Sequence, residues 1–125
     1  MPNALRKPQP DPEAVLTKAT VRAADLLGLR SSDLAKVIGV SGATVSRYRA
    51  AAAGIAPGSK PGELALLLIR VLRSLDPLVG ADDGKRKDWM HSPNRALNGV
   101  PATLVLTPDG LVRTLAYLDG MRAAA

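Results

Sequence analysis

The chain has no cysteine and no phenylalanine, and its only aromatic residues are one tryptophan and two tyrosines. The lack of cysteine excludes disulfides and thiolate metal sites. Apolar residues make up 46% of the 125 residues, and most are leucine, alanine or valine, an aliphatic set that favours helices over a sheet. We therefore expect an all-α fold, built as one modest domain or as two small ones that share a core.

The sequence also lacks a long uninterrupted apolar run. Its most apolar stretch, ELALLLIRVLRSL, is broken by Arg70 and Arg73 and is too short to cross a bilayer. The opening MPNALRKPQPDPE contains four prolines and no apolar segment of a signal peptide. We expect a cytoplasmic protein with no membrane partner, and a disordered arm over residues 1–10.

Patterns typical of enzymes and metal proteins are missing as well. His91 is the only histidine, and Asp82 and Asp83 lack the alternating acids and distal glutamate of a calcium loop. The best case for an enzyme is His91 beside Ser92, but adjacent residues on a turn rarely converge on one substrate atom. We predict no catalytic residue, no metal site and no cofactor.

Basic residues are concentrated in the first half of the chain. Residues 1–60 contain nine Lys/Arg and four Asp/Glu, a net charge of +5, whereas residues 61–125 contain eight and seven, a net charge of +1. A concentrated positive field favours a polyanion such as nucleic acid. Composition alone fits a solvated basic surface equally well, and we expect the basic run at residues 85–87 to be such a surface.

Residues 31–50, SSDLAKVIGVSGATVSRYRA, have the spacing of a helix-turn-helix. Ala35 permits a close crossing, Gly39 permits a left-handed turn, and Val45 can hold the second helix against the first. The second helix would then enter the major groove, where Arg47 could grip guanine. Alternatively, the hairpin is only a scaffold. The residues predicted to contact DNA are Lys36, Ser41, Thr44, Ser46, Arg47 and Arg49.

Capping residues and helical spacing place the other helices. Asp11-Pro12-Glu13 starts a helix that Gly28 ends, and Ser31 or Ser32 is expected to cap the next one. The longest helix is expected to begin at Pro61 and to end at Asp76-Pro77. Its predicted apolar stripe consists of Leu64, Leu67, Leu68, Val71, Leu72 and Leu75. Leu66 and Ile69 lie off this stripe, which suggests that the helix buries a second face.

The last third of the chain contains a denser pattern. A short helix with an acidic start is expected to end near Trp89, which we expect to be a buried anchor before it is a contact. A turn-rich segment follows, and WMHSPNRALNGVP spans residues 89–101. Two short helical pieces are then expected between residues 102 and 121, separated by TPDG at residues 107–110, with Thr107 as an N-cap.

These patterns resemble the Xre/MbcA/ParS antitoxins over residues 15–121. The resemblance implies an N-terminal Xre-type helix-turn-helix bundle, a long central helix and a small helical C-terminal toxin-binding domain. It implies a RES-domain toxin that degrades NAD⁺ as the partner, with occlusion of the toxin's active site as the mechanism. The toxin-binding residues that it implies are Trp89, Pro93, Asn94, Leu97, Gly99 and Pro101. Arg122, near the C-terminus, could pair with acidic groups of the toxin.

The resulting hypothesis is a bifunctional antitoxin. Residues 11–60 would form the DNA-binding domain, and residues 61–125 would form the long helix and the toxin-binding domain. We predict a homodimer within a hetero-oligomer, which neutralises the toxin and represses its own operon by binding operator DNA. The alternative is a helix-turn-helix transcriptional regulator whose C-terminal half only dimerises. Both alternatives predict DNA binding with a steep salt dependence, but only the first requires a toxin.

Overall fold

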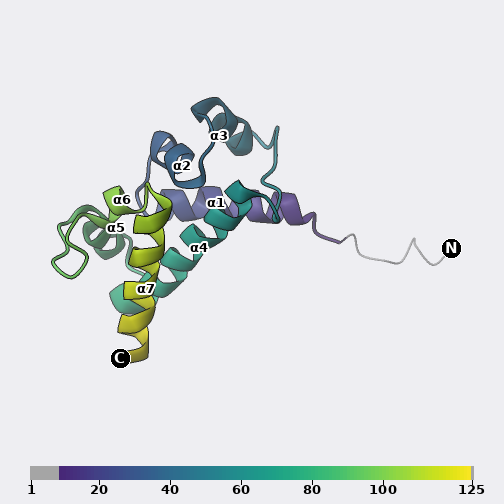
Figure 1. Cartoon of the computed structure of the whole chain (residues 1–125). Helices are drawn as coiled ribbons and strands as arrows, with labels where there is room; N and C mark the ends of the chain where they lie inside the picture. Colours follow the sequence, from purple (N-terminus) through teal and green to yellow (C-terminus); the bar gives the residue numbers. More distant parts are fainter. Residues whose placement is uncertain (1–8, 125) are drawn as a thin grey trace.

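The computed structural model describes residues 9–124, and helices joined by short turns dominate this part of the chain (Figure 1). The helices are α1 (Pro12–Leu26), α2 (Ser31–Ile38), α3 (Gly42–Arg49), α4 (Lys60–Val79), α5 (Asp83–His91), α6 (Pro101–Leu104) and α7 (Pro108–Ala124). The predicted all-α fold is confirmed. Most of the predicted arm, residues 1–8, lies outside the described residues. Within residues 9–124, no helix is both long and apolar enough to cross a membrane.

The N-terminal bundle consists of α1, α2 and α3. As predicted, Asp11 caps α1, since its carboxylate accepts the N–H of Glu13 at 3.0 Å. The prediction for the start of α2 is wrong, because Ser31 is the first helical residue and not the cap. The carboxylate of Asp33 reaches back instead and accepts the N–H of Arg30 at 2.9 Å. An acid in this position satisfies a free N–H and also suits the positive end of the helix.

The central helix α4 is longer than predicted at both ends. It begins at Lys60, where the hydroxyl of Ser59 accepts the N–H of Gly62 at 3.1 Å. It also continues through Pro77, which was expected to end it, and stops at Gly80 in the left-handed conformation (φ +64°). Pro77 lies in the last turn, so the helix forgoes only the hydrogen bond that the missing N–H would have made.

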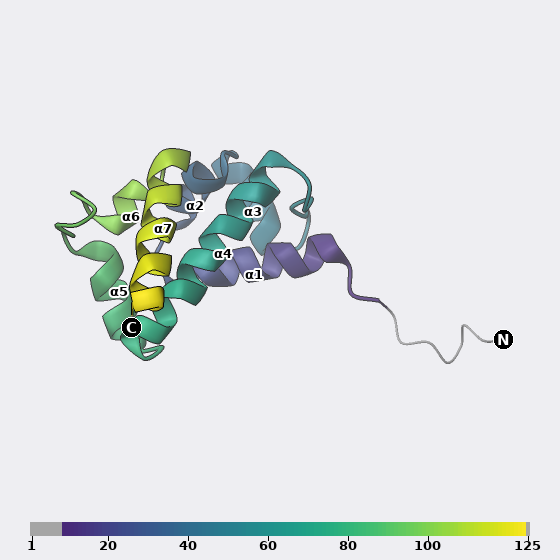
Figure 2. The same cartoon turned by 60° about the horizontal axis from the view of Figure 1, so that its bottom comes forward.

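The buried face of α4 differs from the predicted stripe. Leu68, Val71 and Leu75 are fully buried as predicted, but Ile69, which was left off the stripe, is also buried. Three other members of the stripe are only partly buried: Leu64, Leu67 and Leu72. The reason is that α4 contacts α1 and α2 as well as α7, so its buried surface exceeds one stripe (Figure 2). The predicted second face is thus confirmed for Ile69 and wrong for Leu66, which is exposed.

In the C-terminal half, the short α6 contacts α7, and α5 contacts α6 and α4 (Figures 1 and 2). Thr107 caps α7 as predicted, since its hydroxyl oxygen accepts the N–H of Gly110 at 3.2 Å. However, α7 is a full 17-residue helix, and residues 108–110 form its first turn rather than a separating loop. Gly110 is required there, because a Cβ would overlap the carbonyl oxygen of Leu104 where α6 approaches α7.

One hydrophobic core joins the two halves of the molecule. Fully buried side chains from the N-terminal bundle, from α4 and from the C-terminal half belong to the same cluster, and the largest include Leu27, Leu34, Ile38, Leu68, Leu75, Met90, Leu111 and Leu118. The helix-turn-helix and the C-terminal segments are therefore held in fixed positions by α4, which both contact. The domain boundary that the sequence predicts after residue 60 therefore divides a continuous core.

Candidate functional site

The residues that the sequence assigned to the helix-turn-helix have the expected geometry. Ala35 and Val45 are buried, and Gly39 ends α2 in the left-handed conformation with φ +72°. The N–H of Gly39 and that of Val40 both donate to the carbonyl oxygen of Ala35. The small side chain of Ala35, the left-handed glycine and the buried valine together fix α3 against α2, as the spacing predicted.

The start of α3 presents polar side chains on an exposed surface. Ser41 caps the helix, since its Oγ accepts the N–H of Thr44 at 3.1 Å. Arg47 is exposed, and its Nη2 donates to Thr44 Oγ1 at 3.3 Å. Ser46 is exposed and donates to the carbonyl oxygen of Gly42 at 3.2 Å. Because the hydrogen bond from Arg47 to Thr44 is long and exposed to solvent, water can replace it, and Arg47 can turn toward a base edge or a phosphate.

The two remaining candidates for DNA contact differ from each other. Lys36 is exposed on α2 and makes no ion pair within residues 9–124. Arg49 is occupied, because its guanidinium pairs with Asp25 at 2.9 Å and donates to Ser31 Oγ at 2.8 Å. The hydrogen bond with Asp25 raises the pKa of Arg49. Arg49 therefore ties α3 to α1 and to the start of α2, a positioning role that sequence analysis missed.

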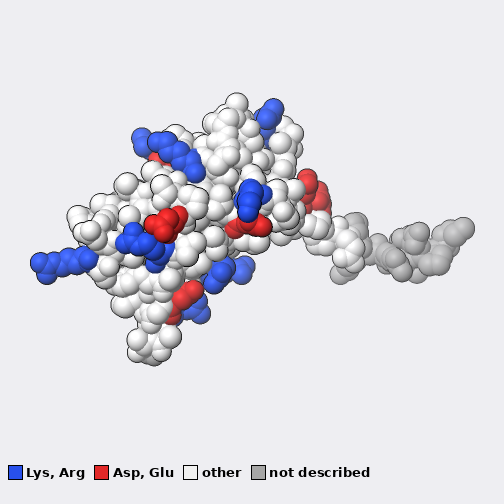
Figure 3. All heavy atoms as spheres, viewed as in Figure 1, with Lys and Arg blue, Asp and Glu red and all other residues white. Residues whose placement is uncertain are grey.

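Basic side chains do not form a continuous patch on the face shown in Figure 3. They lie singly on that face, and several have an acidic side chain beside them. The positive charge on this face is thus spread over the surface. On this face, affinity for nucleic acid would depend on a few well-placed side chains rather than on a broad positive field.

Three of the predicted toxin-binding residues build one closed turn. Asn94 and Gly99 exchange backbone hydrogen bonds of 2.8 and 3.2 Å, and the side chain of Asn94 accepts the N–H of Leu97 at 3.1 Å. Leu97 is buried inside this turn. Arg113, from α7, donates to the carbonyl oxygen of Leu97 at 2.8 Å and fastens the turn to that helix. These residues shape the turn more than they line its surface.

The other predicted toxin-binding residues are scattered. Pro101 is buried at the start of α6, Pro93 is exposed, and Arg122 lies near the far end of α7. Trp89, expected to be buried, is only partly buried against the core. It lines an open cleft of about 550 Å³ together with the exposed Leu78. The structure thus leaves part of the tryptophan available to a partner.

The basic run at residues 85–87 is not the solvated face that was predicted. Lys85 and Lys87 are exposed, but Arg86 is buried. Its guanidinium pairs with Asp76 at 2.7 Å and with Asp83 at 3.1 Å. The hydrogen bond to Asp76 raises the pKa of Arg86. The pair with Asp76 joins α5 to α4, whereas the pair with Asp83 lies within α5. The spacing of three residues between Asp83 and Arg86 was a sequence signal for the second pair only.

His91 connects the C-terminal half to the N-terminal bundle. Its side chain is exposed, but its Nε2 lies 3.0 Å from the carbonyl oxygen of Gly28, just after α1. Gly28 has a φ of +72°, and a Cβ there would lie 2.9 Å from the same Nε2. His91 thus faces solvent and contacts the N-terminal bundle through one ring nitrogen.

The chain matches two family models, which follow each other in the order of the helices. The antitoxin Xre-like helix-turn-helix domain matches residues 8–70, and the antitoxin Xre/MbcA/ParS C-terminal toxin-binding domain matches residues 74–123. The two matches meet within α4, the helix that both halves contact. No curated protein matches the chain. With a helix-turn-helix followed by a toxin-binding domain, the chain belongs to the Xre/MbcA/ParS-type antitoxins.

Proposed function

We propose that this antitoxin neutralises a RES-domain toxin, which degrades NAD⁺, by covering the toxin's active site. We further propose that it represses its own operon as a homodimer bound to operator DNA. Residues 11–60 would supply the DNA-binding function and residues 61–125 the toxin-binding function. Antitoxin families of this regulatory kind are generally non-enzymatic, which supports a steric, stoichiometric mechanism.

The cleft beside Trp89 carries the toxin-binding part of the proposal. Trp89 lies inside the segment that matches the toxin-binding domain, and Leu78 exposes 36% of its surface on the same cleft. Partly exposed tryptophan beside an exposed leucine offers an apolar anchor, and tryptophan is enriched among residues that dominate binding energy. The closed turn formed by Asn94, Leu97 and Gly99 would act as the rigid support of this surface.

The exposed start of α3 supports the DNA-binding part. Arg47 and Lys36 are exposed cations on the two helices of the motif. The N–H groups at the start of α3 can also bind a phosphate. Gly42 and Ala43 offer few groups that read bases, so a single copy would have little specificity. A dimer that binds two half-sites would compensate for this.

Co-expression with the adjacent gene tests the toxin-binding part. We expect the wild-type antitoxin to restore growth and to co-purify with the product of that gene. Leu78→Asp should abolish both, because it places a charge in the apolar cleft. Leu66→Asp is the matched control, since Leu66 is another exposed leucine of α4 and does not line the cleft. If the wild-type chain neither binds nor neutralises the adjacent product, the proposal is wrong.

A further inference from the structure

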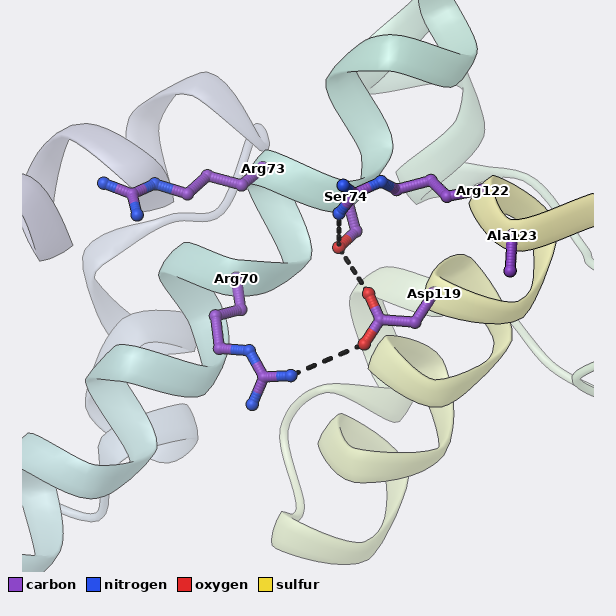
Figure 4. A pocket seen from close by; sticks show the side chains of 6 residues that line it. All are labelled: Arg70, Arg73, Ser74, Asp119, Arg122 and Ala123. Carbon is purple, nitrogen blue, oxygen red and sulfur yellow. Dashed lines mark hydrogen bonds and ion pairs between the residues drawn. The ribbon is translucent and has the colours of Figure 1, made fainter. Parts of the chain in front are cut away.

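A second open cleft, of about 540 Å³, lies between α4 and the end of α7 (Figure 4). Its lining residues are Arg70, Arg73, Ser74, Asp119, Arg122 and Ala123. Three guanidinium groups therefore share the cleft with a single carboxylate, which leaves a net charge of +2. None of these residues lines the cleft beside Trp89. We refer to this site as the arginine cleft.

The single carboxylate of the cleft, that of Asp119, already has partners within the chain. The buried hydroxyl of Ser74 donates to Asp119 Oδ1 at 2.6 Å and accepts a hydrogen bond from Arg122 Nη1 at 3.1 Å. Arg70 approaches the other oxygen of Asp119 only to 3.5 Å. This network positions Asp119 and Arg122, but it cannot balance three positive charges.

Arg73 is the arginine of this cleft that has no partner among the described residues. Figure 4 shows its side chain extending away from Asp119 at the edge of the cleft. Within residues 9–124 it makes no ion pair and no side-chain hydrogen bond. Because a guanidinium presents several donors in a fixed fork, it is suited to a planar carboxylate from outside.

We propose that the arginine cleft receives carboxylate side chains of the toxin. The inference rests on the proposed function, because it assigns a second contact to the same partner. Ser74, Asp119 and Arg122 lie within the segment that matches the toxin-binding domain. Arginine is also enriched at protein interfaces. Asp119 would repel a multiply charged phosphate more strongly than a single carboxylate, which favours acidic side chains as the occupant.

The exposure of the cleft determines what it contributes. The side chain of Arg70 is 57% exposed and that of Asp119 is 41% exposed, so a carboxylate bound there stays partly in water. Charges in such a place mainly accelerate association and make it dependent on salt, whereas buried anchors slow dissociation. The arginine cleft would therefore steer the toxin, and the apolar cleft at Trp89 would retain it.

Association kinetics with the purified product of the adjacent gene test this inference in the full-length antitoxin. Arg73→Glu should slow association about tenfold at low ionic strength, and the difference should shrink at high salt. Arg122→Glu should act in the same direction. The matched control is Lys60→Glu, which makes the same charge change at the other end of α4, where the lysine is exposed. It should alter association by less than about twofold.

Each outcome separates this inference from the proposed function. If both arginine variants associate at the wild-type rate at every salt concentration, the inference is overturned while toxin binding stands. If the wild-type chain does not bind the adjacent product, the proposed function fails and the inference fails with it. Saturable binding of inorganic phosphate that Arg73→Glu removes, with unchanged toxin association, would assign the cleft to a small oxyanion and overturn the inference.

Discussion

The two halves of the molecule use their motif residues differently. In the helix-turn-helix, the buried residues Ala35 and Val45 hold the fold, while Arg47 and Ser46 remain on the surface. In the C-terminal half, Leu97 is buried, and the side chain of Asn94 accepts a hydrogen bond within the turn that contains it. In the first half, the residues that build the fold differ from the residues that face solvent. In the second half, the residues of the recognisable pattern build the fold themselves.

This difference changes how a family pattern should be interpreted. A residue that recurs because it builds a turn indicates where the binding domain is, without being a contact itself. In the C-terminal half the exposed groups that line the cleft at Trp89, such as Leu78 and part of Trp89 itself, are better placed to touch a partner. The match to a toxin-binding domain also disfavours the alternative in which this half only dimerises.

The largest expected effect concerns the buried turn. Leu97→Ala should lower the free energy of unfolding by about 3 kcal/mol, because it removes buried methyl groups and leaves a cavity. Urea denaturation measures this change. Toxin binding should fall only as far as the folded fraction falls. If the variant is as stable as the wild type but loses toxin binding, Leu97 is a contact residue. That result would contradict the difference between the two halves.

The next effect concerns the exposed arginine of α3. Arg47→Ala should weaken operator binding by about 1–3 kcal/mol if its guanidinium reads a base. Its unfolding free energy should stay within about 0.5 kcal/mol of the wild type, since the side chain is exposed. A DNA titration and a urea titration of the same preparation check both statements. An unchanged operator affinity would remove Arg47 from the DNA-binding surface.

Arg49 sharpens the comparison within the helix-turn-helix. Arg49→Ala breaks the hydrogen bonds to Asp25 and Ser31 and should cost about 1 kcal/mol of folding stability. It should thus behave more like a residue of the scaffold than Arg47 does. Thermal or urea unfolding of the two variants compares them directly. Equal stabilities would contradict the positioning role assigned to Arg49.

The smallest effect is a dependence on pH. Partial burial alone would raise the pKa of Asp33, but hydrogen bonds from the backbone and side chain of Arg30, together with the charges of Arg30 and Lys36, hold it below its ordinary value. The stabilisation from this carboxylate is therefore present above the unfolded pKa of about 4 and is lost as pH falls through the lower folded pKa. The stability difference between wild type and Asp33→Asn should shrink below about pH 4. A constant difference would exclude this carboxylate as its source.

Several local patterns were predictable from the sequence, although the start of α2 and the end of α4 were not. Contacts between distant segments were not predictable. The caps at Asp11 and Thr107 depend on residues within three positions, and the structure has both. The burial of Ile69 instead depends on the number of helices that contact α4. Likewise, Arg86 is buried because α4 carries Asp76 to its side.

The site was predictable to a similar extent. The spacing of the helix-turn-helix indicated an exposed Arg47, but nothing nearby in the sequence indicated that Asp25 and Ser31 would occupy Arg49, 24 and 18 residues away. The resemblance placed its toxin-binding residues between 89 and 122, and the match to the toxin-binding domain covers residues 74–123. It could not separate the residues that build the turn from those that border it, because that distinction depends on burial.

The central claim is that one continuous fold presents two separate binding surfaces. The most direct measurement compares the affinities of Arg47→Ala and Leu78→Asp for both the operator and the product of the adjacent gene. We predict that Arg47→Ala loses about fivefold to 150-fold in operator affinity and keeps toxin binding. Leu78→Asp should show the reverse. The account is contradicted if folded Leu78→Asp binds the toxin as tightly as the wild type does.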